Sequence, residues 1–322
     1  MTARRRQLVA GTVLVAAAFG AAAYGQGQAP VVPRRPGSLA AGPNGVLYVA
    51  DTVRHQVLAR LPDGSIRVEA GTGRPGHSGD GGLAVDAELD TPYGMAVGRD
   101  GTLYVADART DRVRAISPGG KIRTVAEIRS PTAVVIGPVG ALYVAAAGAN
   151  EVVRVGRHGV LTRVAGTGNA GPAGVSGIGG PATRASADGP SGLAFDRAGD
   201  LFIAGFNTKT LLMVTRNGTM TLPDGRDGFY PRGEGGLLAT RRGVLAIDGQ
   251  RIVRLMPHGI RTLVDFRGRR LGGVTGFEPN GIAYAGGGAL YVDTYEGNGF
   301  ASASALVEVD PAGRIRLLWR SG

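Results

Sequence analysis

The segment Gly45-Val46-Leu47-Tyr48-Val49-Ala50-Asp51 returns almost unchanged as Gly101-Thr102-Leu103-Tyr104-Val105-Ala106-Asp107. A glycine that permits a tight turn, followed by a short apolar run, is typical of a β-strand entered from a turn. Weaker copies of the segment start at Gly140, Gly199, Gly243 and Gly288. Recurrence of one strand along the chain predicts a repeat protein, and glycine at this density excludes a helix bundle.

Each copy belongs to a longer unit of four short strands. A proline and an apolar strand precede five of the copies, at Pro36, Pro92, Pro131, Pro190 and Pro279, whereas the fifth unit in chain order opens on the degenerate Pro231-Arg232-Gly233-Glu234. A third strand, a glycine turn and a fourth strand follow each copy. Because six such meanders bury both faces only when they pack radially, the sequence predicts an all-β fold, a six-bladed β-propeller of four-stranded antiparallel blades over residues 36–322.

These residues resemble the NHL-repeat family, in its exported bacterial form. The resemblance rests on the strand Leu47-Tyr48-Val49-Ala50-Asp51 and on the glycine-rich insertion 71–82, which a second insertion at 166–171 matches. It implies a binding role, similar to the extracellular sensor domains of actinobacterial receptor kinases. Related six-bladed propellers are peptide-amidating lyases, gluconolactonase-type hydrolases and virginiamycin-type lyases, and fold alone does not choose among them. The segment Arg54-His55-Gln56 departs from the family's Asn-His-Leu-like signature.

The N-terminus has the pattern of an export signal. Arg4-Arg5-Arg6 precedes an uncharged run from Leu8 to Tyr24, and small residues follow at Ala23-Tyr24-Gly25. We expect residues 1–25 to be a signal peptide, similar to the twin-arginine type, or an uncleaved N-terminal anchor, and residues 26–35 to be a linker. The predicted location is secreted or extracytoplasmic, with membrane contact only through an uncleaved N-terminal segment.

The amino-acid composition limits which metal sites and covalent cross-links the chain can form. The chain has no cysteine and only four histidines, and its formal net charge is +11. The absence of cysteine excludes a disulfide scaffold and a thiolate metal site. His158 and His258 occupy peripheral turns and His55 and His77 lie in loops of the first unit, so we expect no histidine-based metal centre. Four acids near Ser78-Gly79-Asp80-Gly81-Gly82 could gather oxygens for Ca²⁺, but alternating Asp and Gly favours consecutive turns.

Arginines account for the positive charge. Arg67, Arg123, Arg261 and Arg316 share one register of the outermost strands, and Arg60, Arg114 and Arg154 lie on third strands. This pattern predicts a charged outer wall that discourages edge pairing and that could attract an anionic cell-envelope polymer. We expect no nucleic-acid partner, because stacking aromatics do not accompany the charge and the chain carries an export pattern.

The best candidate site is the mouth of the central channel. The residue after each strand-starting proline should line this mouth, together with one acid in the degenerate fifth unit; the candidates are Tyr93, Thr132, Ser191, Arg232, Glu234 and Asn280. These groups can hydrogen-bond a ligand but do not form the carboxylate cluster that a metal needs. We therefore expect a monomeric, non-enzymatic module without cofactor, metal or catalytic residues, which binds a protein, a peptide, a glycan or an anionic envelope polymer. The alternative is a metal-dependent lactonase-type hydrolase or virginiamycin-type lyase that uses Glu234, with Asp293 in the sixth unit a further carboxylate to examine.

Overall fold

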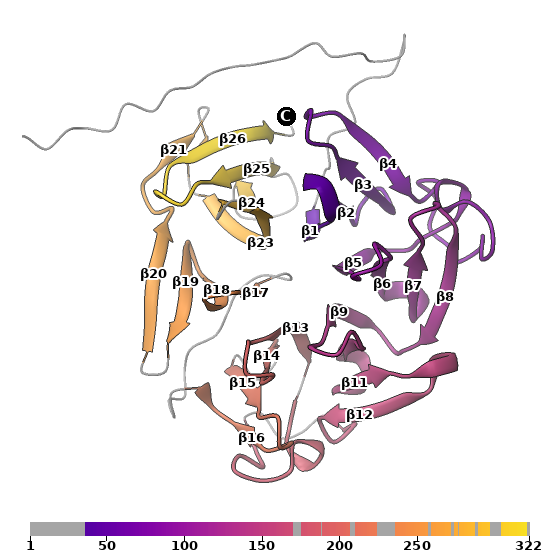
Figure 1. The fold of residues 1–322 in the computed structure, drawn as a ribbon, viewed down its shortest axis with the longest axis vertical. Coiled ribbons are helices and arrows are strands. Elements are labelled where there is room, and N and C mark those ends of the chain that lie inside the picture. The colour runs from indigo at the N-terminus through magenta and orange to yellow at the C-terminus, as the bar shows by residue number, and fades with distance from the viewer. Residues whose placement is uncertain are drawn as a thin grey trace, which may run out of the picture.

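The computed structural model describes residues 36–169, 175–187, 189–206, 210–223, 236–256, 259–271, 274–275, 277–286, 289–296 and 304–320. The predicted signal peptide and linker, as well as Arg232, Glu234 and His258, lie outside the described residues. Six four-stranded antiparallel sheets stand in a ring around a central channel (Figure 1). The predicted six-bladed β-propeller is therefore confirmed. No helix among the described residues has the length and hydropathy needed to cross a membrane.

Strand order within each blade follows the chain from the channel to the rim. The strands of blades one to three are β1 (Pro36–Ala41), β2 (Leu47–Asp51), β3 (Gln56–Arg60) and β4 (Ile66–Ala70); β5 (Pro92–Val97), β6 (Leu103–Asp107), β7 (Arg112–Ile116) and β8 (Ile122–Glu127); and β9 (Pro131–Ile136), β10 (Leu142–Ala146), β11 (Glu151–Val155) and β12 (Leu161–Ala165).

Blades four to six follow the same plan. Their strands are β13 (Pro190–Phe195), β14 (Leu201–Gly205), β15 (Thr210–Val214) and β16 (Met220–Thr221); β17 (Leu237–Thr240), β18 (Gly243–Asp248), β19 (Arg251–Met256) and β20 (Gly259–Asp265); and β23 (Phe277–Gly286), β24 (Ala289–Glu296), β25 (Ser304–Val309) and β26 (Ile315–Arg320). A small sheet of β21 (Arg270–Leu271) and β22 (Val274–Thr275) lies between blades five and six in sequence. Short 3-10 helices are η1 (Pro43–Gly45), η2 (Ala84–Asp86), η3 (Ala108–Thr110), η4 (Ala147–Ala149), η5 (Arg157–Gly159) and η6 (Ala182–Arg184).

Each described blade is one continuous stretch of chain. The ring closes where β23 of the last blade packs beside β1 of the first, and among the described residues no strand is exchanged between these two blades. Within the described residues, the first and last blades therefore meet by packing of their inner strands, as neighbouring blades do elsewhere in the ring.

An aromatic side chain on the second strand of most blades packs against the following blade. Tyr48, for example, belongs to the cluster that blade one shares with blade two, and Phe202 to the cluster that blade four shares with blade five. The equivalent residues of blades two, three and six are Tyr104, Tyr143 and Tyr291. Blade five has the smaller Leu245 at this position. The interface between blades five and six is therefore filled differently from the others.

The two glycine-rich insertions each cover the outer edge of the next blade. In the first, the Gly81 amide donates to the Ile122 carbonyl at 2.8 Å and the Ile122 amide to the Gly82 carbonyl at 3.1 Å. In the second, Gly179 and Gly180 exchange equivalent bonds with Met220, at 2.8 and 2.9 Å. Each insertion thus pairs with an edge strand through two backbone hydrogen bonds, so this part of the edge cannot pair with another chain.

A glycine starts each insertion at a place where no side chain fits. Gly71 has φ +96°, and a Cβ there would lie 2.3 Å from the His55 carbonyl oxygen. Gly166 repeats the geometry, with φ +89° and a distance of 2.3 Å to the Asn150 carbonyl oxygen. The insertions are therefore matched in backbone as well as in sequence.

We expect Gly71→Ala to destabilise the fold well beyond the cost of left-handed backbone alone. The control is Gly81→Ala in the same insertion, where φ is +86° and nothing lies within 4 Å of the added Cβ. The control should lose about 1 kcal/mol of unfolding free energy through backbone strain. Gly71→Ala should lose about 2–4 kcal/mol, because its Cβ also overlaps a carbonyl oxygen. Urea unfolding of both variants measures the difference, and equal losses would contradict the predicted overlap.

Candidate functional site

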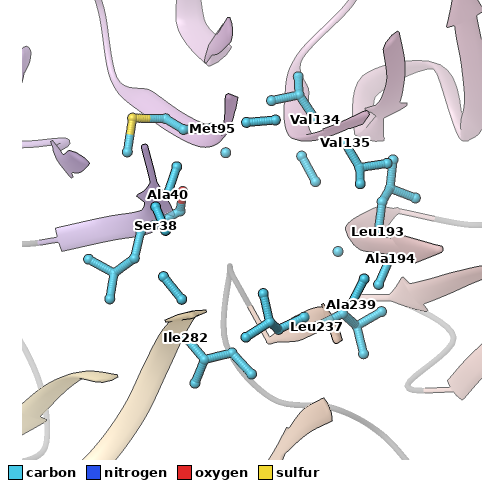
Figure 2. A pocket seen from close by; sticks show the side chains of 18 of the residues that line it. Ser38, Ala40, Met95, Val134, Val135, Leu193, Ala194, Leu237, Ala239 and Ile282 are labelled. Carbon is cyan, nitrogen blue, oxygen red and sulfur yellow. The ribbon is translucent and has the colours of Figure 1, made fainter. Parts of the chain in front are cut away.

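The innermost strands enclose an apolar channel of about 230 Å³. Figure 2 shows residues from all six inner strands arranged around it, among them Met95, Leu193 and Ile282. No carboxylate, imidazole or cation occurs among the described residues that line it. Strands β1, β5, β9, β13, β17 and β23 place small and aliphatic residues here because their alternate side chains face the axis. The channel can therefore hold an apolar group but offers almost no polar contacts.

Ser38 is a polar exception in the channel wall. Its side chain is 4% exposed, and its Oγ has no hydrogen-bond partner. Figure 2 shows Ser38 beside Ala40 on the channel lining. A buried hydroxyl without a partner costs free energy that a bound water or ligand would recover.

The predicted mouth residues lie one place after the proline that starts each inner strand. The Thr132 hydroxyl donates to the Pro190 carbonyl at 2.7 Å and so joins blades three and four. The Ser191 hydroxyl donates to the Ala204 carbonyl at 3.2 Å within its own blade. Tyr93 packs on the cluster that blades two and three share. The Thr132 and Ser191 hydroxyls keep their oxygen lone pairs as acceptors, so both can still accept a hydrogen bond from a ligand.

Blade six places a carboxylate at the same end of the channel. Asn280 is buried, and its Nδ2 lies 3.5 Å from Asp293 Oδ2. The Asp293 side chain is fully buried. The pair supplies one carboxylate and one amide, fewer groups than a divalent cation needs. The described residues contain no group of three or more metal-ligating acids or histidines. Glu234, the remaining acid named from sequence, lies outside the described residues.

The described histidines do not converge. His55 accepts from the Thr91 amide through Nδ1 at 3.3 Å, and the same Nδ1 lies 3.2 Å from Asp90 Oδ1. His77 and His158 are exposed, and His158 occupies the turn between β11 and β12. Their separate positions agree with turn and loop roles.

The structure corrects the expectation that Arg114 belongs to a solvated outer wall. Its side chain is fully buried beneath the first insertion. The guanidinium pairs with Asp80 at 2.7 Å, lies 3.7 Å from Asp107, and donates to the carbonyls of Glu88 and Ser78 at 3.1 and 3.3 Å. The insertion covers this face of the third strand, which alternation of residues along the strand could not reveal.

The pKa values of the two acids around Arg114 are shifted in opposite directions. Desolvation raises the pKa of Asp107 to about 6, although bonds from Thr110 and the Asp90 amide and the Arg114 charge oppose the rise. Partial burial also acts to raise the pKa of Asp80, but hydrogen bonds from Thr124 and the Arg114 charge bring it below its ordinary value. Asp80 thus accepts hydrogen bonds from Arg114 and from the Thr124 amide, the latter at 2.9 Å, and so holds the first insertion against blade two. We call Asp80, Asp107 and Arg114 together the clasp.

Comparison with known proteins supports the propeller fold, and the proteins that match differ from one another in function. The sequence model of the teneurin NHL domain family matches residues 82–225. Human Teneurin-4 is 38% identical over 92 residues, which make up 24% of this chain and 3% of Teneurin-4. A virginiamycin B lyase from Staphylococcus aureus superposes with a TM-score of 0.51 at 16% identity, covering 79% of this chain and 75% of the lyase. A gluconolactonase from Xanthomonas campestris gives 0.56 at 15% identity, covering 88% and 86%. At these identities the two structures share the fold alone.

Proposed function

Because the chain belongs to the NHL-repeat β-propellers, we propose that it is an exported recognition module, without catalysis of its own, that binds a peptide, a glycan or another cell-envelope component at the mouth of its channel. The observation that carries this proposal is the uncharged, aliphatic channel, and we place the predicted polar side chains at its mouth. Sites of this kind take an apolar group into the cavity and fix it with a few polar contacts at the rim. The N-terminal export pattern supports an extracytoplasmic ligand.

The channel volume indicates how much of a ligand enters. An apolar cavity of about 150 Å³ accommodates a benzene-sized molecule, and the channel measures about 230 Å³. One leucine- or phenylalanine-sized group fits, whereas a whole peptide or sugar chain does not. The ligand would rest on the mouth, near the hydroxyls of Thr132 and Ser191, with one apolar substituent in the channel. This geometry favours a peptide or a substituted glycan.

The proposal predicts that filling the channel abolishes binding. Ala239 is exposed and lines the channel (Figure 2), so Ala239→Phe should occupy the cavity while leaving the melting temperature within a few degrees. The labelled protein and the variant would be compared on peptide and envelope-glycan arrays, and spots bound by the wild type should lose at least about tenfold signal, equal to 1.4 kcal/mol. Lys121→Ala, on the exposed outer face, is the control. Unchanged binding by Ala239→Phe would reject the channel as the site.

A second candidate is the metal-dependent hydrolase or lyase, which the Asn280–Asp293 pair at the mouth favours. Metal analysis of the purified protein, with melting before and after EDTA, tests it. A stoichiometric cation whose removal lowers the melting temperature, and whose retention requires Asp293, would support this alternative through the linkage of binding to folding. Lactone hydrolysis should then be assayed.

A further inference from the structure

A second cavity opens between blades five and six. Its volume is about 550 Å³, and strands of both blades form its walls. Leu245, Leu263 and Leu290 form an aliphatic part of the lining. Four arginines also line it: Arg241, Arg242, Arg254 and Arg261. We call this cavity the arginine cleft.

The cleft exists where blade five departs from the other blades. Leu245 replaces the aromatic residue that faces the next blade elsewhere in the ring, so less volume is filled at this interface. Arg254 lies opposite Leu245 on the adjoining strand, and Arg261 lies opposite Arg254 on the strand beyond. Two guanidinium groups therefore stand side by side along one row of the sheet.

The equivalent pairs in the other blades do not repeat this charge. They are Ala59 with Arg67, Ala115 with Arg123, Arg154 with Thr162, Met213 with Thr221, and Glu308 with Arg316. In blade six the pair is complementary and forms an ion pair. Like charges directly opposite each other on adjacent strands are destabilising. Blade five alone, among the described blades, thus carries a repulsion that a bound anion would relieve.

No protein group neutralises the four arginines within the described part of the chain. None of their guanidinium groups makes an ion pair or a hydrogen bond there, and the Arg254 Nε is buried without a partner. The lone acid in the lining, Asp310, accepts from its own turn, through the amides of Ala312 and Arg314 at 2.9 Å and Arg314 Nε at 2.6 Å. Hydrogen bonds from Arg314 hold the pKa of Asp310 below its ordinary value. The cleft therefore keeps a concentrated positive charge.

We propose that the arginine cleft is a binding site for a ligand with two or more linked phosphoryl groups. Guanidinium groups bind phosphate through paired N–H···O bonds. Arg254 is half-buried, which strengthens its bonds, whereas the other three arginines are exposed and accessible to a ligand. A carboxylate has its two oxygens and their lone pairs in one plane, which suits donors that lie in that plane. A tetrahedral phosphoryl group offers oxygens in several directions, so it can accept from Arg254 and Arg261 together. Arg241 and Arg242, in the turn between β17 and β18, would take the second phosphoryl group.

Calorimetric titration with inorganic pyrophosphate at low ionic strength tests the proposal. We expect saturable binding that is at least about tenfold tighter than that of citrate, because charge-assisted bonds to arginine contribute roughly 1.5–3 kcal/mol each. Arg254→Glu should weaken pyrophosphate binding by about tenfold or more. This substitution copies the Glu308–Arg316 arrangement of blade six, so the melting temperature should be retained or raised. A melting scan checks that the variant is folded.

The matched control is Arg154→Glu, which makes the same charge change at the equivalent position of the third strand in blade three, away from the cleft. Its binding should remain close to wild type. The proposal is wrong if the two variants lose equal affinity, if citrate binds as tightly as pyrophosphate, or if pyrophosphate gives no saturable heat. A poly(glycerol phosphate) fragment, titrated in parallel, distinguishes two sources of the phosphoryl groups. If the fragment binds and pyrophosphate displaces it, the ligand is a phosphodiester polymer. If pyrophosphate binds and the fragment does not, the ligand is a free diphosphate. Failure of these titrations leaves the channel proposal standing, because none of the four arginines lines the channel.

Discussion

Arg114→Ala should destabilise the protein by about 3–5 kcal/mol, the usual cost of removing one member of a buried ion pair. The guanidinium is fully buried, and its loss leaves the Asp107 carboxylate without its nearby positive charge. It also leaves the carbonyls of Ser78 and Glu88 without their donor. The first insertion would then separate from blade two. Urea unfolding measures the loss, and protease cleavage within residues 72–90 should accelerate.

The chain itself supplies the design of a control. At matching places in the second insertion and blade four, Ile178 replaces Asp80 and Leu212 replaces Arg114, and blade three has Ala146 where blade two has Asp107. The triple variant Asp80→Ile, Asp107→Ala, Arg114→Leu should therefore recover most of the stability that Arg114→Ala loses. If Arg114→Ala costs under about 1 kcal/mol, a value typical of exposed pairs, the clasp is not structural.

The sequence predicted the blades because each contains its own turn glycine, apolar strand and proline. These signals are local, so six independent copies reinforce one another. The insertions were also predictable, since Ala70 and Ala165 begin identical Ala-Gly-Thr-Gly segments. What the insertions cover was not predictable from local pattern. Arg114 carries the same charge as Arg60 and Arg154, yet only Arg114 lies under an insertion and is fully buried. Comparing the insertions pairwise, Asp80 with Ile178 and Arg114 with Leu212, is the signal that could have identified it.

For the candidate sites too, features set by a short segment could be predicted from the sequence, whereas features set by contacts between distant segments could not. The position after each inner proline is a local signal, and the expectation that these side chains line the channel mouth stays a prediction, because none of the described ones is among the residues that line the channel. The bond from Thr132 to Pro190 depends on the spacing between two blades, which no segment encodes alone. The arginine cleft follows from register across three strands of blade five. The sequence places Arg261 in a shared row, but only strand pairing reveals Arg254 opposite it.

We expect the stability of the protein to fall as the pH rises from about 4 to about 6.5, the reverse of the usual acid denaturation. Burial raises the pKa of Asp107 to about 6 in the folded chain, against the ordinary value of 3.8. Between these values the folded state holds a proton that the unfolded state has released, so increasing pH favours unfolding. The contribution is on the order of 3 kcal/mol, is present in full below the unfolded pKa, and is lost as the pH passes the folded pKa.

The variant Asp107→Asn isolates this contribution. An asparagine keeps an oxygen that can accept from the Asp90 amide, a bond of 2.7 Å in the wild type, but it cannot ionise. Its unfolding free energy should be nearly constant from pH 4 to 6.5 and should exceed that of the wild type at the upper end. Asp63, Asp100 and Asp310 have pKa values below the ordinary range because of hydrogen bonds, so their contributions disappear at lower pH and do not mask the effect. A wild-type curve that is flat or rising across this window would mean that Arg114, at 3.7 Å, stabilises the Asp107 carboxylate enough to offset its burial. The clasp would then be an ordinary buried ion pair, and Asp107→Asn would be less stable than the wild type at neutral pH.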